Sequence, residues 1–173
     1  MSLRNDIRWR WAAFIGLAVV VIITDQVSKA WIRSNLVYGD PPVQVIGDLV
    51  RLVFSHNSGG IFGLFGDSAL ILAASSLVVI GLIVIYEWRE GSHSWPLTLA
   101  LGLLLGGAIG NFIDRLVYGY VTDFIDVGIG TSRFYTFNVA DSAISTALLL
   151  LVLIALFHER RTRQRPAHEA SQS

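Results

Sequence analysis

Apolar residues run together in four long stretches of this chain, and most of the charged residues lie between or beyond them. About 20 mostly apolar residues span a bilayer core of ~30 Å, because an α-helix rises ~1.5 Å per residue. The stretches therefore predict transmembrane helices over about residues 11–32, 68–86, 94–113 and 139–157. The first stretch follows three arginines like a signal peptide, but it lacks a small-residue cleavage motif, so we interpret it as a retained anchor.

In the third stretch, Gly102, Gly106 and Gly110 recur every four residues. Glycines at this spacing leave a smooth stripe along one side of a helix, where a second helix can approach closely. The simplest interpretation of the stripe is helix packing.

Between the first two stretches the pattern changes to a two-residue period, which is typical of a β-strand. Apolar residues alternate on both sides of a turn at residues 47–48, namely Val43, Val45, Val50, Leu52 and Phe54. They predict an antiparallel hairpin. The segment 121–127 is rich in β-branched and apolar residues and predicts an extended conformation. The expected fold is an all-α integral membrane protein with four transmembrane helices, a small extracytoplasmic β-hairpin platform and an extended outer loop.

Composition and charge add a topology to this picture. Hydrophobic residues make up 53% of the chain, above the ~45–50% usual in soluble domains. The thirteen basic and thirteen acidic residues cancel, so net charge indicates no nucleic-acid partner. Eight of the thirteen Lys and Arg precede the first span, follow the second or lie in the C-terminal tail, which predicts cytoplasmic termini. We expect residues 1–158 to form one membrane domain and the basic tail 159–173 to be disordered.

Polar residues of the spans gather toward one face of the membrane. Asp25, Asn111 and Asp141 lie fifteen to seventeen residues from the cytoplasmic ends of their spans, or ~22–26 Å along a helix. Further polar residues follow in the adjoining outer segments, namely Asn57, Asp114, Arg115, Asp123 and Asn138. A charge in hydrocarbon costs at least ~2.5–3.5 kcal/mol, so polar residues that converge at one depth predict a site.

Some of these residues also have simpler interpretations. Asp25 and Lys29 are four apart on one helical face, which is typical of an ion pair whose lysine reaches out to the interface. Asp114 precedes Arg115 near a helix end, where orienting that arginine is a sufficient role. Asn111 and Arg115 also share a face, so an amide and a guanidinium are directed the same way, as binding of a substrate carbonyl or carboxylate requires.

The remaining acids differ in how easily they are explained. Asp123 and Asp126 lie in the segment predicted to be extended, where residues three apart face opposite sides. Only one of them can point toward the other polar residues, and we expect Asp126 to face solvent. Asn138 is a natural N-cap for the fourth span, whereas a capping role suits Asp141 less well.

Two carboxyl groups in a partly dehydrated site do not both ionise readily, so one keeps a proton while the other is an anion. The anion can take a proton from water as the water attacks an amide, while the acid stabilises the carbonyl oxygen. Rival chemistries lack their residues. There is no cysteine, the four histidines show no His-x-x-x-His spacing for zinc, and adjacent Ser28 and Lys29 point ~100° apart on a helix. We expect neither a metal nor a cofactor.

Five segments of the chain stand in an order and spacing that is specific as a set, although each alone is a weak signal. They are Asp25-Gln-Val-Ser-Lys29, Asn57-Ser-Gly-Gly-Ile-Phe-Gly63, Gly106-Gly-Ala-Ile-Gly-Asn-Phe-Ile-Asp-Arg115, Val121-Thr-Asp-Phe124 and Phe137-Asn-Val-Ala-Asp141. Together, over roughly residues 20–145, they resemble the lipoprotein signal peptidases, or signal peptidase II.

The resemblance implies an intramembrane aspartic endopeptidase in the bacterial cytoplasmic (inner) membrane, with its active site at the outer leaflet. Its substrate would be a prolipoprotein with a diacylglyceryl cysteine, cut on the N-terminal side of that cysteine. The resemblance also implies that Asp123 and Asp141 are the catalytic pair. The substrate-binding and supporting residues that it implies are Asp25, Lys29, Asn57, Gly59, Asn111, Asp114, Arg115, Asn138 and Ala140. We expect a monomer whose partners are this substrate and membrane lipids.

A proton-coupled membrane transporter is the main alternative, because acids within helices also form proton relays. A relay requires polar residues at several depths, whereas the inner halves of the four spans are nearly free of ionisable groups. The sequence therefore favours the peptidase.

Overall fold

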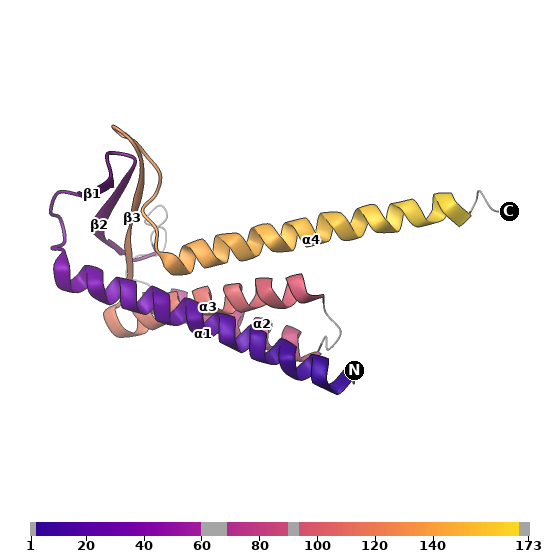
Figure 1. The fold of residues 1–173 in the computed structure, drawn as a ribbon. Helices are drawn as coiled ribbons and strands as arrows, with labels where there is room; N and C mark the ends of the chain where they lie inside the picture. Colours follow the sequence, from indigo (N-terminus) through magenta and orange to yellow (C-terminus); the bar gives the residue numbers. More distant parts are fainter. Residues whose placement is uncertain (1–2, 60–68, 90–93, 170–173) are drawn as a thin grey trace.

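Four long helices and a small sheet at one end of them make up the fold (Figure 1). The computed structural model describes residues 3–59, 69–89 and 94–169. The helices are α1 (Leu3–Asn35), α2 (Ala69–Arg89), α3 (Trp95–Tyr118) and α4 (Val139–Glu169). Each contains a stretch that is long and apolar enough to cross a membrane, which confirms the four predicted spans. The predicted start of the second span, at residue 68, lies outside the described residues.

The C-terminal ends of α4 and α3 each show a feature of the chain. The segment that we predicted to be disordered from residue 159 is helical as far as Glu169, because its arginines and glutamine are good helix formers and extend a helix already begun. Gly119 caps the C-terminus of α3, and its left-handed conformation (φ 77°) lets its N–H donate to the Arg115 carbonyl. The chain turns there and enters a strand within two residues.

α3 lies against each of the other three helices. A Cβ atom at Gly106 would lie 2.8 Å from the carbonyl oxygen of Ala18 on α1, and one at Gly107 would lie 2.6 Å from that of Ala140 on α4. The predicted glycine stripe therefore faces α1, and Gly107 allows α4 to approach on another side. Large apolar side chains are left exposed on the outside of the helices, which suits a lipid solvent.

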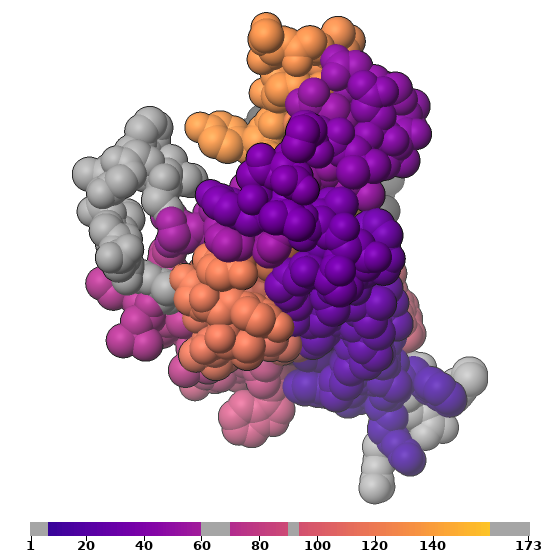
Figure 2. Space-filling model, turned by 90° about the vertical axis from the view of Figure 1, so that its left-hand side faces the viewer, coloured from indigo at the N-terminus to yellow at the C-terminus, as the bar shows by residue number. Residues whose placement is uncertain are grey.

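The sheet consists of β1 (Val43–Ile46), β2 (Val50–Asn57), β3 (Val121–Ile129) and β4 (Ser132–Arg133), paired antiparallel in this order. The predicted hairpin is confirmed as β1–β2, and the segment predicted to be extended is β3. Both hairpins project beyond the helices at the top of Figure 2. α1 begins and α4 ends at the opposite end of the molecule from the sheet (Figure 1).

Asp126 holds the outer part of the sheet together. It is buried, and its carboxylate lies 2.6 Å from Arg51 Nη2 on β2 and 2.9 Å from Arg133 Nε on β4. The carbonyl oxygen of Asp48, in the β1–β2 turn, accepts a further bond from Arg133 Nη1 at 2.6 Å. The prediction that Asp126 faces solvent is wrong, because arginines from two neighbouring strands cover it.

The glycine contacts predict a difference between two alanine substitutions. Gly106→Ala forces α1 away from α3 and lowers the thermal unfolding temperature in detergent, at a cost of about 1–3 kcal/mol for overpacking. Gly16→Ala is the matched control, because nothing lies within 4 Å of a Cβ at that helical glycine. Equal unfolding temperatures for the two variants would contradict the packing described here.

Candidate active site

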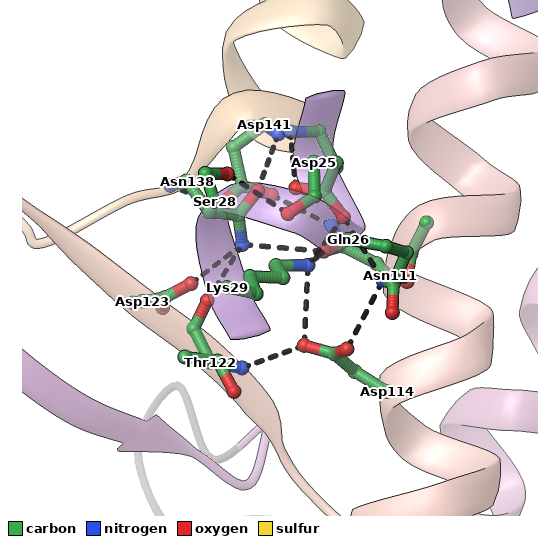
Figure 3. A network of polar contacts seen from close by, with 12 residues as sticks. Asp25, Gln26, Ser28, Lys29, Asn111, Asp114, Thr122, Asp123, Asn138 and Asp141 are labelled. Atoms are coloured by element: carbon green, nitrogen blue, oxygen red, sulfur yellow. Dashed lines mark hydrogen bonds and ion pairs between the residues drawn. The ribbon is translucent and has the colours of Figure 1, made fainter. Parts of the chain in front are cut away.

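Polar side chains from α1, α3, β3 and the start of α4 meet where the helices adjoin the sheet (Figure 3). Asp25 Oδ1 on α1 accepts the backbone N–H of Ala140 on α4 at 2.9 Å. Asn111 Nδ2 on α3 donates to Asp141 Oδ1 on α4 at 2.8 Å. Of the three residues that the depth count placed in one layer, Asn111 and Asp141 are in direct contact, and Lys29 joins Asp25 to Asn111.

The ammonium of Lys29 is the positive charge at the centre of this layer. It is fully buried and lies 2.8 Å from Asp25 Oδ2, 3.2 Å from Asp114 Oδ2 and 3.0 Å from Asn111 Oδ1. The predicted Asp25–Lys29 ion pair is confirmed. The expectation that the lysine reaches out to the interface is wrong, because three acceptors inside the protein use its three N–H groups.

Lys29 also decides how the amide of Asn111 is oriented. An ammonium has only donors, so Asn111 must turn its oxygen toward Lys29 and its NH₂ group away. The same oxygen accepts a bond from Asn138 Nδ2 at 3.2 Å. The amide of Asn111 therefore has one orientation, with its nitrogen on Asp141.

We expected Asp114 to orient Arg115, but its hydrogen bonds join the helices to β3 instead. Its Oδ2 accepts the backbone N–H of Thr122 at 2.9 Å, and its Oδ1 accepts a bond from Gln26 Nε2 at 3.2 Å. Arg33 Nη1 lies 3.7 Å from Oδ1 and donates to Thr122 Oγ1 at 2.9 Å. These bonds fix the first residues of β3 against α1 and α3.

Asn138 and Asp141 cap α4 reciprocally. Asn138 Oδ1 accepts the backbone N–H of Asp141 at 2.8 Å, and Asp141 Oδ2 accepts the backbone N–H of Asn138 at 3.2 Å. This is the geometry of a capping box, with an asparagine and an aspartate in its two positions. The N-cap predicted at Asn138 is confirmed, and Asp141 shares the cap, contrary to our expectation. With its oxygen committed to the helix, Asn138 directs Nδ2 to Asp123 Oδ1 at 2.7 Å.

Asn57 approaches Asp123 from β2. Its Nδ2 donates to Asp123 Oδ2 at 2.9 Å, and its Oδ1 accepts the backbone N–H of Gly59 at 2.9 Å. Gly59 has a positive φ of 86°, and a Cβ there would collide with Leu72 on α2, so the turn that orients Asn57 requires glycine.

A bulge in β2 determines which side chain reaches Asp123. Leu52 pairs with Ile125 and Ser55 with Asp123, so β2 carries one residue more than β3 in this interval. An unbroken ladder continued from Leu52 would place His56 opposite Val121, whereas the bulge places Asn57 there. His56 instead stacks between Tyr38 and Tyr120, with ring centroids 4.2 and 3.7 Å away. The regular alternation that we predicted for β2 is thus interrupted.

Asp123 is 3% exposed and accepts one amide N–H on each carboxylate oxygen. Burial raises the pKa of Asp123 to about 6. The hydrogen bonds from Asn57 and Asn138 and the charge of Lys29 lower its pKa, whereas the charge of Asp141 raises it. The net shift leaves about a tenth of this carboxyl group protonated at pH 7, far more than at the ordinary aspartate pKa of about 3.9.

Arg115 is the residue of this layer whose donors are least used. Its Nη1 makes one long bond of 3.4 Å to the backbone oxygen of Asn111. Within the described part of the chain, its buried Nε has no hydrogen-bond partner. The guanidinium lies within electrostatic range of both Asp141 and Asp123. It therefore has donors to offer to a ligand beside the two acids.

Comparison with known proteins assigns a family to this arrangement. The sequence model of the signal peptidase (SPase) II family matches residues 17–157. The chain belongs to the signal peptidase II family. A lipoprotein signal peptidase from Syntrophomonas wolfei is 41% identical over 152 residues, covering 87% of this chain and 97% of that protein. One from Caulobacter vibrioides is 42% identical over 163 residues, covering 88% and 90%.

The fold of this chain is also that of a solved protein. A bacterial membrane enzyme determined by the in meso method superposes with a TM-score of 0.76 at 31% identity. The match covers 83% of this chain and 92% of the solved chain.

Within the described residues, no group of three or more His, Cys, Asp or Glu is placed to hold a metal ion.

Three residues of the network were not identified from the sequence. Gln26 bonds Asp25, Asp114 and the carbonyl of Gly110, and Thr122 and Arg33 complete the contact with β3. Gln26 and Thr122 each adjoin a predicted site residue, which was the available signal. Nothing in the chain marked Arg33.

The burial of Lys29 predicts that its replacement has a large effect on the stability of the protein. Lys29→Met leaves Asp25 and Asp114 buried beside an uncharged side chain, and loss of one partner from a buried charge network costs about 3–5 kcal/mol. Thermal unfolding in detergent measures the loss, and the double variant Asp25→Asn/Lys29→Met should regain part of it. A Lys29→Met variant as stable as the wild type would show that Lys29 does not hold this layer together.

Proposed function

We propose that this protein removes the signal peptide from prolipoproteins with a diacylglyceryl cysteine, cutting on the N-terminal side of that cysteine, with Asp123 and Asp141 as the catalytic pair. One observation carries the assignment of the pair. The same asparagine bonds both acids, since Asn138 Nδ2 lies 2.7 Å from Asp123 Oδ1 and its backbone nitrogen 3.2 Å from Asp141 Oδ2. The names of the relatives support the class of substrate.

In the reaction that we propose, one carboxylate takes a proton from water while the water oxygen attacks the scissile carbonyl carbon. The carbonyl oxygen takes the proton of the other carboxyl group, and a gem-diol forms. The first acid then gives its proton to the amide nitrogen as the C–N bond breaks. A gem-diol hydroxyl returns a proton to the second acid, so the pair ends in its starting state without a covalent intermediate.

Arg115 is the residue that we assign to the substrate backbone. Its unused donors suit a peptide carbonyl, which accepts hydrogen bonds without adding charge to the site. A guanidinium offers several donors in a rigid plane, so one side chain can fix the strand of substrate that passes the acids. We assign the exposed Asn57 and the buried Asn111 to the same substrate-binding surface as Arg115.

The supporting residues keep the acids in place without touching the substrate. Asp25, Lys29 and Asp114 form the buried charge network below the pair. Gly59 orients Asn57, and the backbone N–H of Ala140 ties the start of α4 to Asp25. A Cβ at Gly110 would come within 3.4 Å of the Ala140 side chain, so a larger residue at 140 would separate α3 from α4.

The position of the polar layer explains why the substrate would carry lipid. The layer adjoins the sheet, at the end of the helices opposite to both the start of α1 and the end of α4 (Figure 1). With both termini cytoplasmic, this end lies at the outer leaflet of the cytoplasmic membrane. A diacylglyceryl anchor would hold the scissile bond at that depth and supply part of the entropy cost of binding. We assign the protein a monomeric state.

A proton-coupled transporter is not favoured. Its relay would have to pass through the helices, but the polar layer ends below Asp25, where a cluster of buried apolar residues begins. The cluster consists of Phe14, Ala18, Ile83, Leu101 and Leu105. Such packing provides no sites for proton transfer.

Cleavage of a synthetic precursor with a diacylglyceryl cysteine, in detergent micelles, tests this function. Asp123→Asn and Asp141→Asn should each lower the rate at least about 100-fold, because each removes a group that transfers a proton. Asp40→Asn is the matched control, since Asp40 is exposed and lies outside the polar layer. Mass spectrometry of the products identifies the bond that is cut.

Two further arms make the experiment decisive. The same peptide with an unmodified cysteine should be a poor substrate, and a chelator should leave the rate unchanged. Full activity of either aspartate variant with matched unfolding temperatures would refute the proposed pair. Loss of activity with the chelator would point to a metal instead.

A further inference from the structure

The two acids of the proposed pair have different surroundings, although each accepts two N–H donors. Asp141 lies in the first turn of a long helix, and Asp123 lies on a strand. This difference bears on a question that the shared chemistry leaves open, namely which acid holds the proton before the substrate is attacked.

The surroundings of Asp141 are a helix N-terminus and two fixed N–H donors. The N-terminal turn of a helix carries partial positive charge and stabilises an anion. Asp141 Oδ2 accepts the backbone N–H of Asn138, the N-cap residue. A backbone N–H can only donate a hydrogen bond. Asp141 Oδ1 accepts the amide of Asn111, whose orientation is locked by the ammonium of Lys29. Both oxygens thus face donors that are fixed in place.

The surroundings of Asp123 favour its protonated form. Asp123 contacts the N-cap of α4 only through the side chain of Asn138, lies on a strand and not in the first turn of a helix, and is almost completely buried. One of its two donors is the amide of Asn57, an exposed residue at the end of β2, so that bond is less firmly fixed than those on Asp141. The charged groups that act on Asp123 are Lys29 from α1, Arg115 from α3 and Asp141 from α4. The negative charge of Asp141, the other acid, favours a proton on Asp123.

We propose that the resting site is asymmetric: Asp141 is the carboxylate that takes the proton from water, and Asp123 is the acid that protonates the substrate carbonyl oxygen. This inference rests on the proposed peptidase function and assigns the two roles within it. Lys29 then has a catalytic consequence without touching the substrate, because it is a positioning residue that acts on Asp141 through Asn111. The direction of the shift in the pKa of Asp123, which burial raises, agrees with this division.

The pH profile of Asn57→Ala distinguishes the two assignments. The bond from Asn57 lowers the pKa of Asp123, so its removal raises that pKa. If Asp123 must be protonated, activity falls as pH rises through its pKa, and the alkaline limb of the profile moves to higher pH by about one unit. If Asp123 were the base, the acidic limb would move to higher pH and the alkaline limb would stay in place. Two coupled acids titrate as a pair, so the limbs are compared between variants.

Asn35→Ala is the matched control, because Asn35 is an exposed asparagine whose bonds are confined to the end of its own helix. Its profile should superpose on that of the wild type. A shift of the acidic limb alone in Asn57→Ala overturns the assignment and leaves the peptidase function intact.

A second measurement requires no turnover and covers an inactive Asn57→Ala variant. Infrared titration follows the C=O band of protonated carboxyl groups in the wild type and the variant, in which the other buried acids are the same. If Asp123 holds the proton, the last carboxyl proton is lost at higher pH in the variant. An unchanged midpoint for that proton overturns the proposal. Failure of the wild type to cut the lipidated precursor would refute the proposed function, while the titration would still decide which acid is protonated.

Discussion

The polar layer depends on the contacts of one buried ammonium group with its three acceptors. Lys29 is the counter-charge for Asp25 and Asp114, and the third acceptor of its ammonium is Asn111. Removing a lysine from water is costly, and the cost is offset only because its three donors and the acids are satisfied together. Through its bonds to Asp114 and Asn111, the lysine links α1 to α3. Asn111 in turn bonds Asp141 on α4, and Asp114 bonds Thr122 on β3. The fold and the site therefore depend on the same few bonds.

Three asparagines hold the carboxyl groups of the two acids in position. Each has its amide oxygen committed to a donor that cannot accept, namely the Lys29 ammonium, the N–H of Asp141 or the N–H of Gly59. Each amide nitrogen is then left to point at an aspartate. Amides suit this task because they donate to a carboxylate without adding charge. A pair of acids held by neutral donors can share one proton, whereas a pair held by cations would ionise fully.

The sequence predicted the features that follow from local pattern. Apolar runs gave the four spans, alternation gave the β1–β2 hairpin, and helix spacing gave the Asp25–Lys29 pair. It missed features that depend on contacts far apart in the chain. Lys29 turns inward because Asp114 lies on another helix, and Asp126 is buried because its arginines come from β2 and β4. The bulge that selects Asn57 over His56 is set by β3, so the alternation within β2 could not show it.

The central claim is that the amide donor which Lys29 directs to Asp141 is required for catalysis. Asn111→Asp tests it most directly, because the new carboxylate has the size of the amide and still accepts from Lys29 but cannot donate to Asp141. The measurement is the rate of cleavage of a lipidated precursor, taken alongside the unfolding temperature. We predict a folded protein whose rate falls at least about 100-fold at neutral pH. A folded variant with the wild-type rate would contradict the claim.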